Sequence, residues 1–190
     1  MNSQTSLQTY LQSKLSLDKE TALQCASLFS FCEYKAGAQI IRMGDVADSM
    51  QLVLQGLVRA YYIDENGTEI TKCFAKENEW CGFYSYLSEK PSPFFVETLE
   101  PTVTAKIKTS DIKILASSST AVQEKVSELV NKAFLSVDKK SYDFANKEAK
   151  DRYLEFAQEN PEIVRRAKQE HIASYLGITP SSLSRIKREL

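Results

Sequence analysis

The spacing of apolar residues divides the chain into three parts. Residues 3–31 place apolar side chains at helical intervals, as in Leu7, Tyr10 and Leu11. Between about residues 32 and 110, short runs rich in β-branched and aromatic residues alternate with glycines. From Asp111 to Glu159 there is neither glycine nor proline, and helical spacing returns. The pattern predicts helices, then a set of short strands, then helices again.

The middle part has the turn signals of an antiparallel fold. Five of the six glycines lie between Gly37 and Gly82, and glycine supplies the positive φ that tight turns need. Asn66-Gly67 separates two strand-like runs, which is a strong hairpin signal. Seven or eight short strands at this spacing favour a β-sandwich, jelly roll or barrel. The clearest expected strands are 39–42, 50–55, 57–64, 69–75, 94–99 and 102–107.

The helical parts carry recognisable boundaries. Asp18 is expected to cap a helix in the N-terminal part. Asp138 is expected to end a long helix near residue 137 and to cap a new one. The following helix should end at Asn160, because the residue before Pro161 avoids the helical region. The long helix has one apolar stripe, which periodicity alone favours as core packing over a dimer interface: Val122, Val126, Leu129, Ala133 and Val137.

The last 22 residues, QEHIASYLGITPSSLSRIKREL, match the helix-turn-helix pattern. Ala173 is small where the two helices must approach closely, and Gly177 stands at the turn four residues later. Thr179 can cap the second helix, and Pro180 suits its first turn. The alternative is a helical hairpin without a role in DNA binding. The positions expected to be buried are Ile172, Leu176, Ile178, Leu183 and Ile186.

In this motif the second helix enters the major groove with its N-terminal residues facing the bases. Arg185 is the best candidate base reader, since a guanidinium can bond guanine O6 and N7 together. His171 is expected to be a solvated or packing residue of the first helix rather than a ligand. The other candidates for base contact are Pro180, Ser181 and Ser182. The candidates for phosphate contact are Lys168, Gln169, Lys187 and Arg188.

Charge supports the motif. The chain of 190 residues has 24 Lys and Arg against 25 Asp and Glu, a net charge of −1, which excludes a protein that is basic all over. Residues 164–190 nevertheless carry six cations and two anions, so this stretch is +4 and the remainder is −5. A basic C-terminal segment on an acidic body is typical of a DNA-binding protein.

Several other classes are disfavoured. The four cysteines form no C-x-x-C pair and there is one histidine, so we expect no metal centre, and the thiols are expected to be reduced. A thiol redox sensor through Cys73 and Cys81 stays an alternative. No P-loop, GxSxG or HExxH motif is present, so an enzyme is not expected. We also expect no membrane span and no signal peptide, and therefore a cytoplasmic protein.

The segment AGAQIIRMGDVADSMQLVLQGLVRAYYIDENGTE, with the motif order β-roll, long helix and helix-turn-helix, resembles the Crp/Fnr family of bacterial transcription regulators. The resemblance covers about residues 10–190. It implies an α+β fold with N-terminal helices, an antiparallel cyclic-nucleotide-binding jelly roll over 1–115, a long dimerisation helix over 116–137 and a DNA-binding domain over 138–190. The implied partners are double-stranded DNA and a second copy of the chain. The resemblance therefore favours a dimer interface over core packing for the apolar stripe of the long helix. RNA polymerase is a candidate further partner.

The sequence departs from this family at the effector site. Cyclic-AMP binders carry Gly-Glu and, about eleven residues later, Arg-Ser, which hold the ribose hydroxyl and the cyclic phosphate. Here Gly82-Phe83 and Pro93-Phe94 stand at those places, so we expect no tight binding of cyclic AMP and no cofactor. The remaining pocket is aromatic, with Tyr84 and Phe95 beside these residues. It is either filled by its own side chains, which we favour, or open to an apolar effector.

A second departure lies at the end of the sequence. Family members usually continue past the recognition helix into a β-hairpin wing, whereas this sequence stops at Leu190. Without phosphate contacts from a wing, we expect a smaller non-specific affinity and a weaker salt dependence. The alternative function is a small-molecule-sensing module with weak or vestigial DNA binding.

Overall fold

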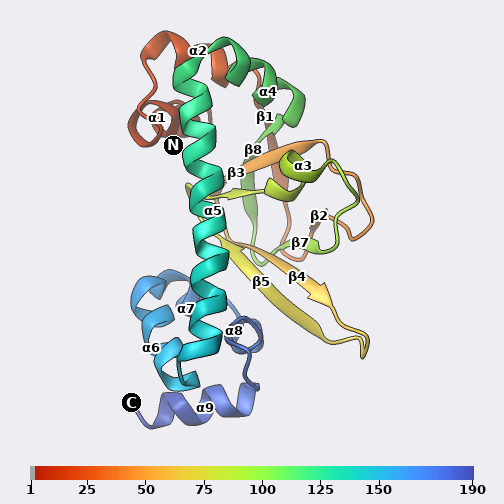
Figure 1. The fold of residues 1–190 in the computed structure, drawn as a ribbon, viewed down its shortest axis with the longest axis vertical. Helices are drawn as coiled ribbons and strands as arrows, with labels where there is room; N and C mark the ends of the chain where they lie inside the picture. The colour runs from red at the N-terminus through yellow and green to blue at the C-terminus, as the bar shows by residue number, and fades with distance from the viewer. Residues whose placement is uncertain (1–2) are drawn as a thin grey trace.

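The computed structural model describes residues 3–190, apart from the side chain of Ser85, and Figure 1 shows its arrangement. The chain begins with α1 (Ser3–Thr9), the π-helical turn η1 (Tyr10–Lys14) and α2 (Lys19–Ala26), which lie beside the start of the longest helix. The Asp18 carboxylate accepts a hydrogen bond of 2.9 Å from the Thr21 backbone N–H. The predicted cap is therefore confirmed.

The middle of the chain forms two antiparallel four-stranded sheets, as the turn-rich pattern predicted. One sheet has the order β1-β8-β3-β6, with β1 (Ser30–Tyr34), β3 (Ser49–Gln55), β6 (Trp80–Cys81) and β8 (Thr102–Lys108). The other has the order β2-β7-β4-β5, with β2 (Gln39–Ile41), β4 (Val58–Ile63), β5 (Glu69–Ala75) and β7 (Phe95–Thr98). The β4–β5 hairpin turns at Asn66-Gly67, where Gly67 has a φ of +79°.

Sequence reasoning missed β1, the two-residue β6 and the short helix α3 (Phe83–Ser88). β1 follows directly on apolar residues that continue the helical spacing, so its pattern gave no separate signal. α3 begins after Gly82, which has a φ of +94°. A Cβ atom on Gly82 would lie 2.8 Å from the Ser49 carbonyl oxygen, so this position requires glycine.

The helical half begins with α4 (Thr109–Ser118) and α5 (Thr120–Asn146). The predicted break at Asp138 is wrong, because α5 runs through this exposed residue without interruption for 27 residues. An aspartate inside a helix costs at most about 0.7 kcal/mol relative to alanine. The helix ends instead at Asn146, before Lys147, whose backbone is extended.

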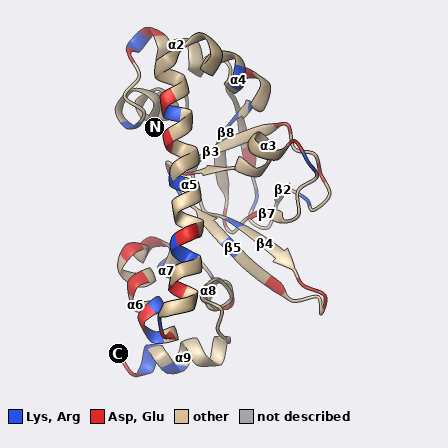
Figure 2. Cartoon of the chain, in the orientation of Figure 1, with Lys and Arg blue, Asp and Glu red and all other residues tan. Residues whose placement is uncertain are grey.

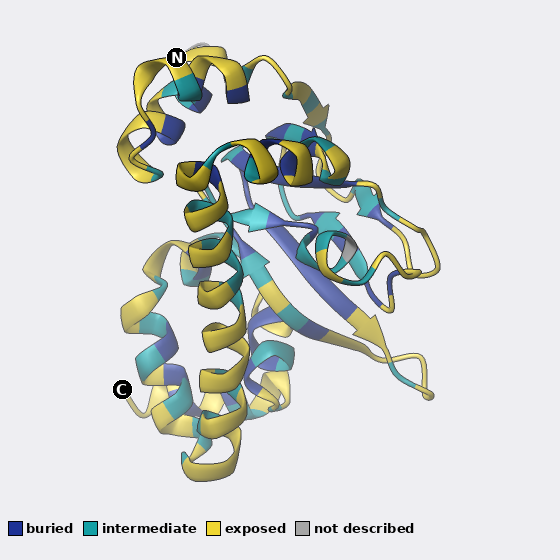
Figure 3. Ribbon diagram, turned by 45° about the horizontal axis from the view of Figure 1, so that its top comes forward, coloured by how far each residue is buried: buried dark blue, intermediate teal, exposed yellow. Residues whose placement is uncertain are grey.

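Four shorter helices complete the chain: α6 (Ala149–Glu159), α7 (Pro161–Arg166), α8 (Gln169–Leu176) and α9 (Pro180–Arg188). α6 ends before Asn160-Pro161, as predicted. Figure 3 shows the buried residues inside the roll and inside the C-terminal helices, with most of α5 exposed along its length. Among residues 3–190, no helix is long and apolar enough to cross a membrane.

Candidate nucleic-acid interface

Helices α8 and α9 pack tightly around a short turn. Gly177 at the turn has a φ of +67°, and Ala173 is fully buried. The Thr179 hydroxyl caps α9 by accepting a hydrogen bond of 3.1 Å from the Ser182 backbone N–H. The residues expected to be buried are buried, with Ile178 half-buried: Ile172, Leu176, Ile178, Leu183 and Ile186. The side chains that fix these two helices are therefore placed as the sequence predicted.

The outer face of α9 is basic. Ser181, Arg185 and Arg188 lie at i, i+4 and i+7, so they share one exposed face, while Leu183 and Ile186 point inward. Pro180 and Lys187 are also exposed, and Ser182 is half-buried beside Thr179. Figure 2 shows the basic segment of α9 next to the C-terminus. Within the part of the chain that the structure describes, Arg185, Lys187 and Arg188 make no ion pair.

The cations before α8 are less available than the sequence suggested. Lys168 and Gln169 are exposed at the start of α8, and the Lys168 ammonium lies 3.4 Å from the Glu170 carboxylate. Arg165 pairs with Glu162 on its own helix. Arg166 turns toward the roll, where its guanidinium pairs with Glu77 and Glu100. Of the six cations in residues 164–190, the three without an ion pair therefore all lie on α9.

The two-helix unit is attached to the rest of the chain at defined points. The Ser174 hydroxyl accepts a hydrogen bond of 2.8 Å from the Thr71 N–H of β5 and donates one of 2.9 Å to the Glu69 carbonyl. The Arg152 guanidinium of α6 donates to the Leu176 carbonyl at 3.1 Å. Sequence reasoning missed these positioning residues, because an arginine or serine in a helix gives no sign of which distant backbone group it will meet.

The predicted dimer stripe of α5 faces partly inward. Val122 is buried, and Val126 packs against the same apolar cluster of the chain. Leu129 and Ala133 are half-buried, and Val137 is 58% exposed. A second row of α5 instead presents large apolar side chains to solvent: Phe134, Leu135, Val137 and Tyr142 are between 58% and 68% exposed. The first turns of the stripe therefore belong to the chain's own core.

Two aromatic residues of the expected effector site, Phe94 and Tyr84, pack together inside the roll. Phe94 is 5% exposed and joins the core of the second sheet. The Tyr84 ring packs edge-on against the Phe94 ring, with 5.6 Å between the two centroids. The Lys72 ammonium lies 4.6 Å from the centroid of the Phe94 ring. Phe95 stacks on Tyr61. Of the other predicted pocket residues, Gly82 directly precedes α3, Phe83 packs against the apolar cluster that includes Val122, and Pro93 is exposed.

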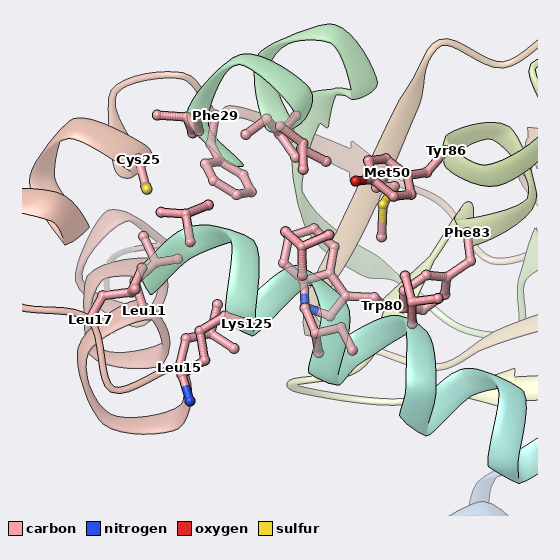
Figure 4. Close-up of a pocket in the computed structure, with 17 residues that line it drawn as sticks. Leu11, Leu15, Leu17, Cys25, Phe29, Met50, Trp80, Phe83, Tyr86 and Lys125 are labelled. Carbon is pink, nitrogen blue, oxygen red and sulfur yellow. The ribbon is translucent and has the colours of Figure 1, made fainter. Parts of the chain in front are cut away.

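A small apolar cavity lies between the N-terminal helices, the first sheet and α5 (Figure 4). Its walls include Phe29, Met50 and Phe83, and the Trp80 indole N–H donates a hydrogen bond of 2.6 Å to the Tyr10 hydroxyl beside it. The volume is about 60 Å³. An apolar cavity that binds benzene measures about 150 Å³, so this one admits only a few atoms in the present arrangement.

The four cysteines are free thiols. Cys25 and Cys81 are buried, Cys32 is half-buried and Cys73 is exposed. Burial raises the pKa of the Cys81 thiol to about 12, so this thiol is protonated at neutral pH. Since the thiolate is the reactive form, Cys81 is poorly suited to a redox switch.

Comparison with known proteins agrees with this architecture. Residues 31–119 match the family model of the cyclic nucleotide-binding domain, which spans β1 to α4. No curated protein matches the sequence. FixK2 from Bradyrhizobium japonicum has a similar fold, with a TM-score of 0.73 and 20% identity over 85% of this chain and 84% of that one.

Two further solved structures share the fold. The catabolite activator protein of Thermus thermophilus has a TM-score of 0.62 and 22% identity, over 94% of this chain and 86% of that one. The regulator CLP of Xanthomonas campestris, which is described as responsive to c-di-GMP, has a TM-score of 0.74 and 15% identity, over 90% and 91%. Residues 31–119 are therefore similar to the cyclic nucleotide-binding domain, and the chain has the overall fold of these three proteins.

Proposed function

We propose that this protein is a homodimeric, sequence-specific DNA-binding transcription regulator of the Crp/Fnr type. The observation that carries the proposal is the exposed, unpaired cationic face of α9 on a tightly packed two-helix unit. Among the described residues, no carboxylate forms an ion pair with Arg185, Lys187 or Arg188, so these cations are available to a polyanion. The role is regulatory and not enzymatic, and its place is the cytoplasm.

The residues divide between base and phosphate contacts. Arg185 lies five residues, or about 1.4 turns, after Pro180 at the exposed start of α9, within reach of base edges once this helix enters the major groove. Pro180, Ser181 and Ser182 lie ahead of it at the helix N-terminus, where small side chains allow close approach. Lys187 and Arg188, with Lys168 and Gln169 of the first helix, contact phosphate.

The exposed apolar row of α5 supports the dimer. A row of large apolar side chains on a long helix is costly to leave in water, and a second copy of the same helix can cover it. In such a dimer the two copies of α9 would read half-sites about one helical turn, or about 34 Å, apart. Because Phe94 and Tyr84 pack together inside the roll, we propose that the effector is not cyclic AMP. RNA polymerase is proposed as a further partner for the case that this regulator activates transcription.

The experiment is selection of genomic DNA fragments by the wild-type protein, followed by fluorescence anisotropy on the enriched sequence and on a scrambled one. Arg185→Ala should lower affinity for the enriched sequence about tenfold or more, which is about 1–3 kcal/mol, with a smaller effect on the scrambled one. Lys187→Ala should weaken both equally and reduce the salt slope by about 1. Lys19→Ala, an exposed lysine at the opposite end of the molecule, is the control. Equal affinity of all four proteins for both sequences would contradict the proposal.

A further inference from the structure

Three potential metal ligands converge where α8 meets the roll. The carboxylates of Glu69 on β5 and Glu97 on β7, and the imidazole of His171 on α8, each bring one ligand atom within 4.8 Å of the others. The His171 side chain is 10% exposed, and its Nδ1 atom is buried without a hydrogen-bond partner among the residues that the structure describes. Buried polar atoms are normally satisfied, so this imidazole has an unused coordination site beside two carboxylates.

Arg59 of β4 holds the two carboxylates in place. Its guanidinium donates to Glu97 Oε1 at 2.8 Å and also to Glu69 Oε2, and its side chain is 2% exposed. Among the described residues, the second oxygens, Glu69 Oε1 and Glu97 Oε2, accept no hydrogen bond. Carboxylates that bind metals are commonly oriented in this way by a hydrogen bond to their outer oxygen.

The local charge leaves room for a cation. Two carboxylates and one guanidinium sum to −1 when the imidazole is neutral. The imidazole of His171 adds a nitrogen ligand without adding charge in its neutral form, which is the form that coordinates a metal ion. Glu69 is 47% exposed at its side chain, which leaves an entry path from solvent.

We propose that Glu69, Glu97 and His171 bind a divalent first-row transition-metal ion of the Zn²⁺ type, with Arg59 orienting the two carboxylates. One imidazole with two carboxylates suits zinc, manganese or iron, whereas Ca²⁺ and Mg²⁺ prefer oxygen ligands alone. Three protein ligands leave a fourth position for water or a small ligand.

The ligands come from both sides of a junction, so the ion would fasten α8 to the roll. Glu69 and Glu97 belong to the second sheet. His171 belongs to α8 of the two-helix unit, next to the buried Ile172. Any effect of the metal on DNA affinity rests on the proposed function, but metal binding itself does not. The test below therefore measures the ion without DNA.

The test titrates Zn²⁺ into the reduced full-length protein and follows the imidazole resonances by NMR. His171 is the one histidine of the chain, so its signals are assigned without ambiguity. We expect saturation at one ion per chain with a new imidazole signal. Titration with Co²⁺ should give visible d–d bands without the near-ultraviolet charge-transfer band of a cobalt–thiolate bond. An unchanged imidazole, or a thiolate band, would show that any binding occurs elsewhere and would overturn the proposal.

Variants provide the second arm by isothermal calorimetry. His171→Gln and Glu69→Gln should each lower Zn²⁺ affinity tenfold or more, as loss of a ligand requires. Glu65→Gln, an exposed carboxylate at the turn of the same hairpin, should bind as the wild type does. Equal affinity in all four proteins overturns the site. Should a variant fail to fold, the NMR titration of the wild type still decides.

Discussion

The Arg166 guanidinium of α7 donates two hydrogen bonds of 2.9 Å to the carboxylate of Glu77, which lies 89 residues earlier in the chain. Glu77 Oε1 also accepts a hydrogen bond of 2.8 Å from the Gly56 N–H, and Arg166 reaches Glu100 as well. The Arg166 side chain is 16% exposed. Bidentate pairing at a partly buried site is among the stronger ion-pair geometries. This contact joins α7, the helix that precedes the two-helix unit, to the roll.

The first prediction concerns this pair. Arg166→Ala leaves Glu77 and Glu100 without their cation, and we expect the free energy of unfolding to fall by about 1–2 kcal/mol. Hydrogen exchange should rise in α8. Arg165→Ala is the matched control: that side chain is 73% exposed and pairs only within its helix, so its effect should stay below about 0.5 kcal/mol. Chemical denaturation compares the free energies of unfolding of the two variants. An equal decrease in both would show that Arg166 does not stabilise the contact between α7 and the roll.

The turn between α8 and α9 gives the second prediction. A Cβ atom at Gly177 would lie 2.4 Å from Cε1 of Phe144, and the φ of +67° disfavours any side chain. We expect Gly177→Ala to destabilise the protein by about 2–4 kcal/mol, of which the backbone conformation accounts for about 1–2 kcal/mol. In a double-mutant cycle, Phe144→Ala should relieve the steric part. Additive effects of the two substitutions would contradict this contact.

The success of the sequence in the C-terminal unit has a local cause. Ala173, Gly177 and Thr179 are each required by steric or capping needs within about ten residues, so their types report the geometry directly. The same holds for Asp18 and the Asn66-Gly67 turn.

Features set by distant residues could not be predicted in this way. Whether Val122 faces a second copy or the chain's own core depends on where the N-terminal helices pack, and periodicity gives only the face of the helix. The same limit applies to His171, Glu69 and Glu97, which meet from three elements. Asp138 shows a different limit of local sequence signals. A single possible capping residue does not end a helix in a stretch that contains neither glycine nor proline.

A half-buried lysine gives the third prediction, a dependence of stability on pH. Lys140 of α5 donates to the carbonyls of Thr71 and Lys72 and lies 4.0 Å from the centre of the Tyr175 ring. Burial lowers its pKa to about 8. From pH 8 to the ordinary lysine pKa near 10.4, the unfolded chain binds more protons than the folded one, so this group makes stability rise with pH.

The measurement compares the wild type with Lys140→Met by denaturation between pH 7.5 and 10.5. The difference in unfolding free energy should grow in favour of the wild type by about 2–3 kcal/mol. The neighbouring charges are Lys72 and the Cys73 thiol, so the comparison is repeated in a Cys73→Ser background. A difference that is flat with pH would mean that Lys140 titrates as an exposed lysine does.

The filled roll gives the fourth prediction. Phe94 lies in the core where a cyclic nucleotide would need space, so cyclic AMP at 1 mM should leave the melting temperature unchanged. A dissociation constant of 10 µM would instead stabilise the protein by about 2.7 kcal/mol, which is a shift of several degrees. 5′-AMP is the control for non-specific effects. A shift with cyclic AMP alone would show that the aromatic side chains move aside.

The exposed row of α5 gives the last prediction, which tests the dimer. Phe134 is 68% exposed and Leu135 is 61% exposed, and a second copy of α5 would bury both. Phe134→Asp places a charge in that contact, so the protein should sediment as a monomer at concentrations where the wild type is a dimer. Ser136→Asp introduces the same charge about 200° further around the helix and should leave the dimer intact. A Phe134→Asp protein that stays dimeric would place the interface on another face, whereas a monomeric wild type would remove the paired half-sites.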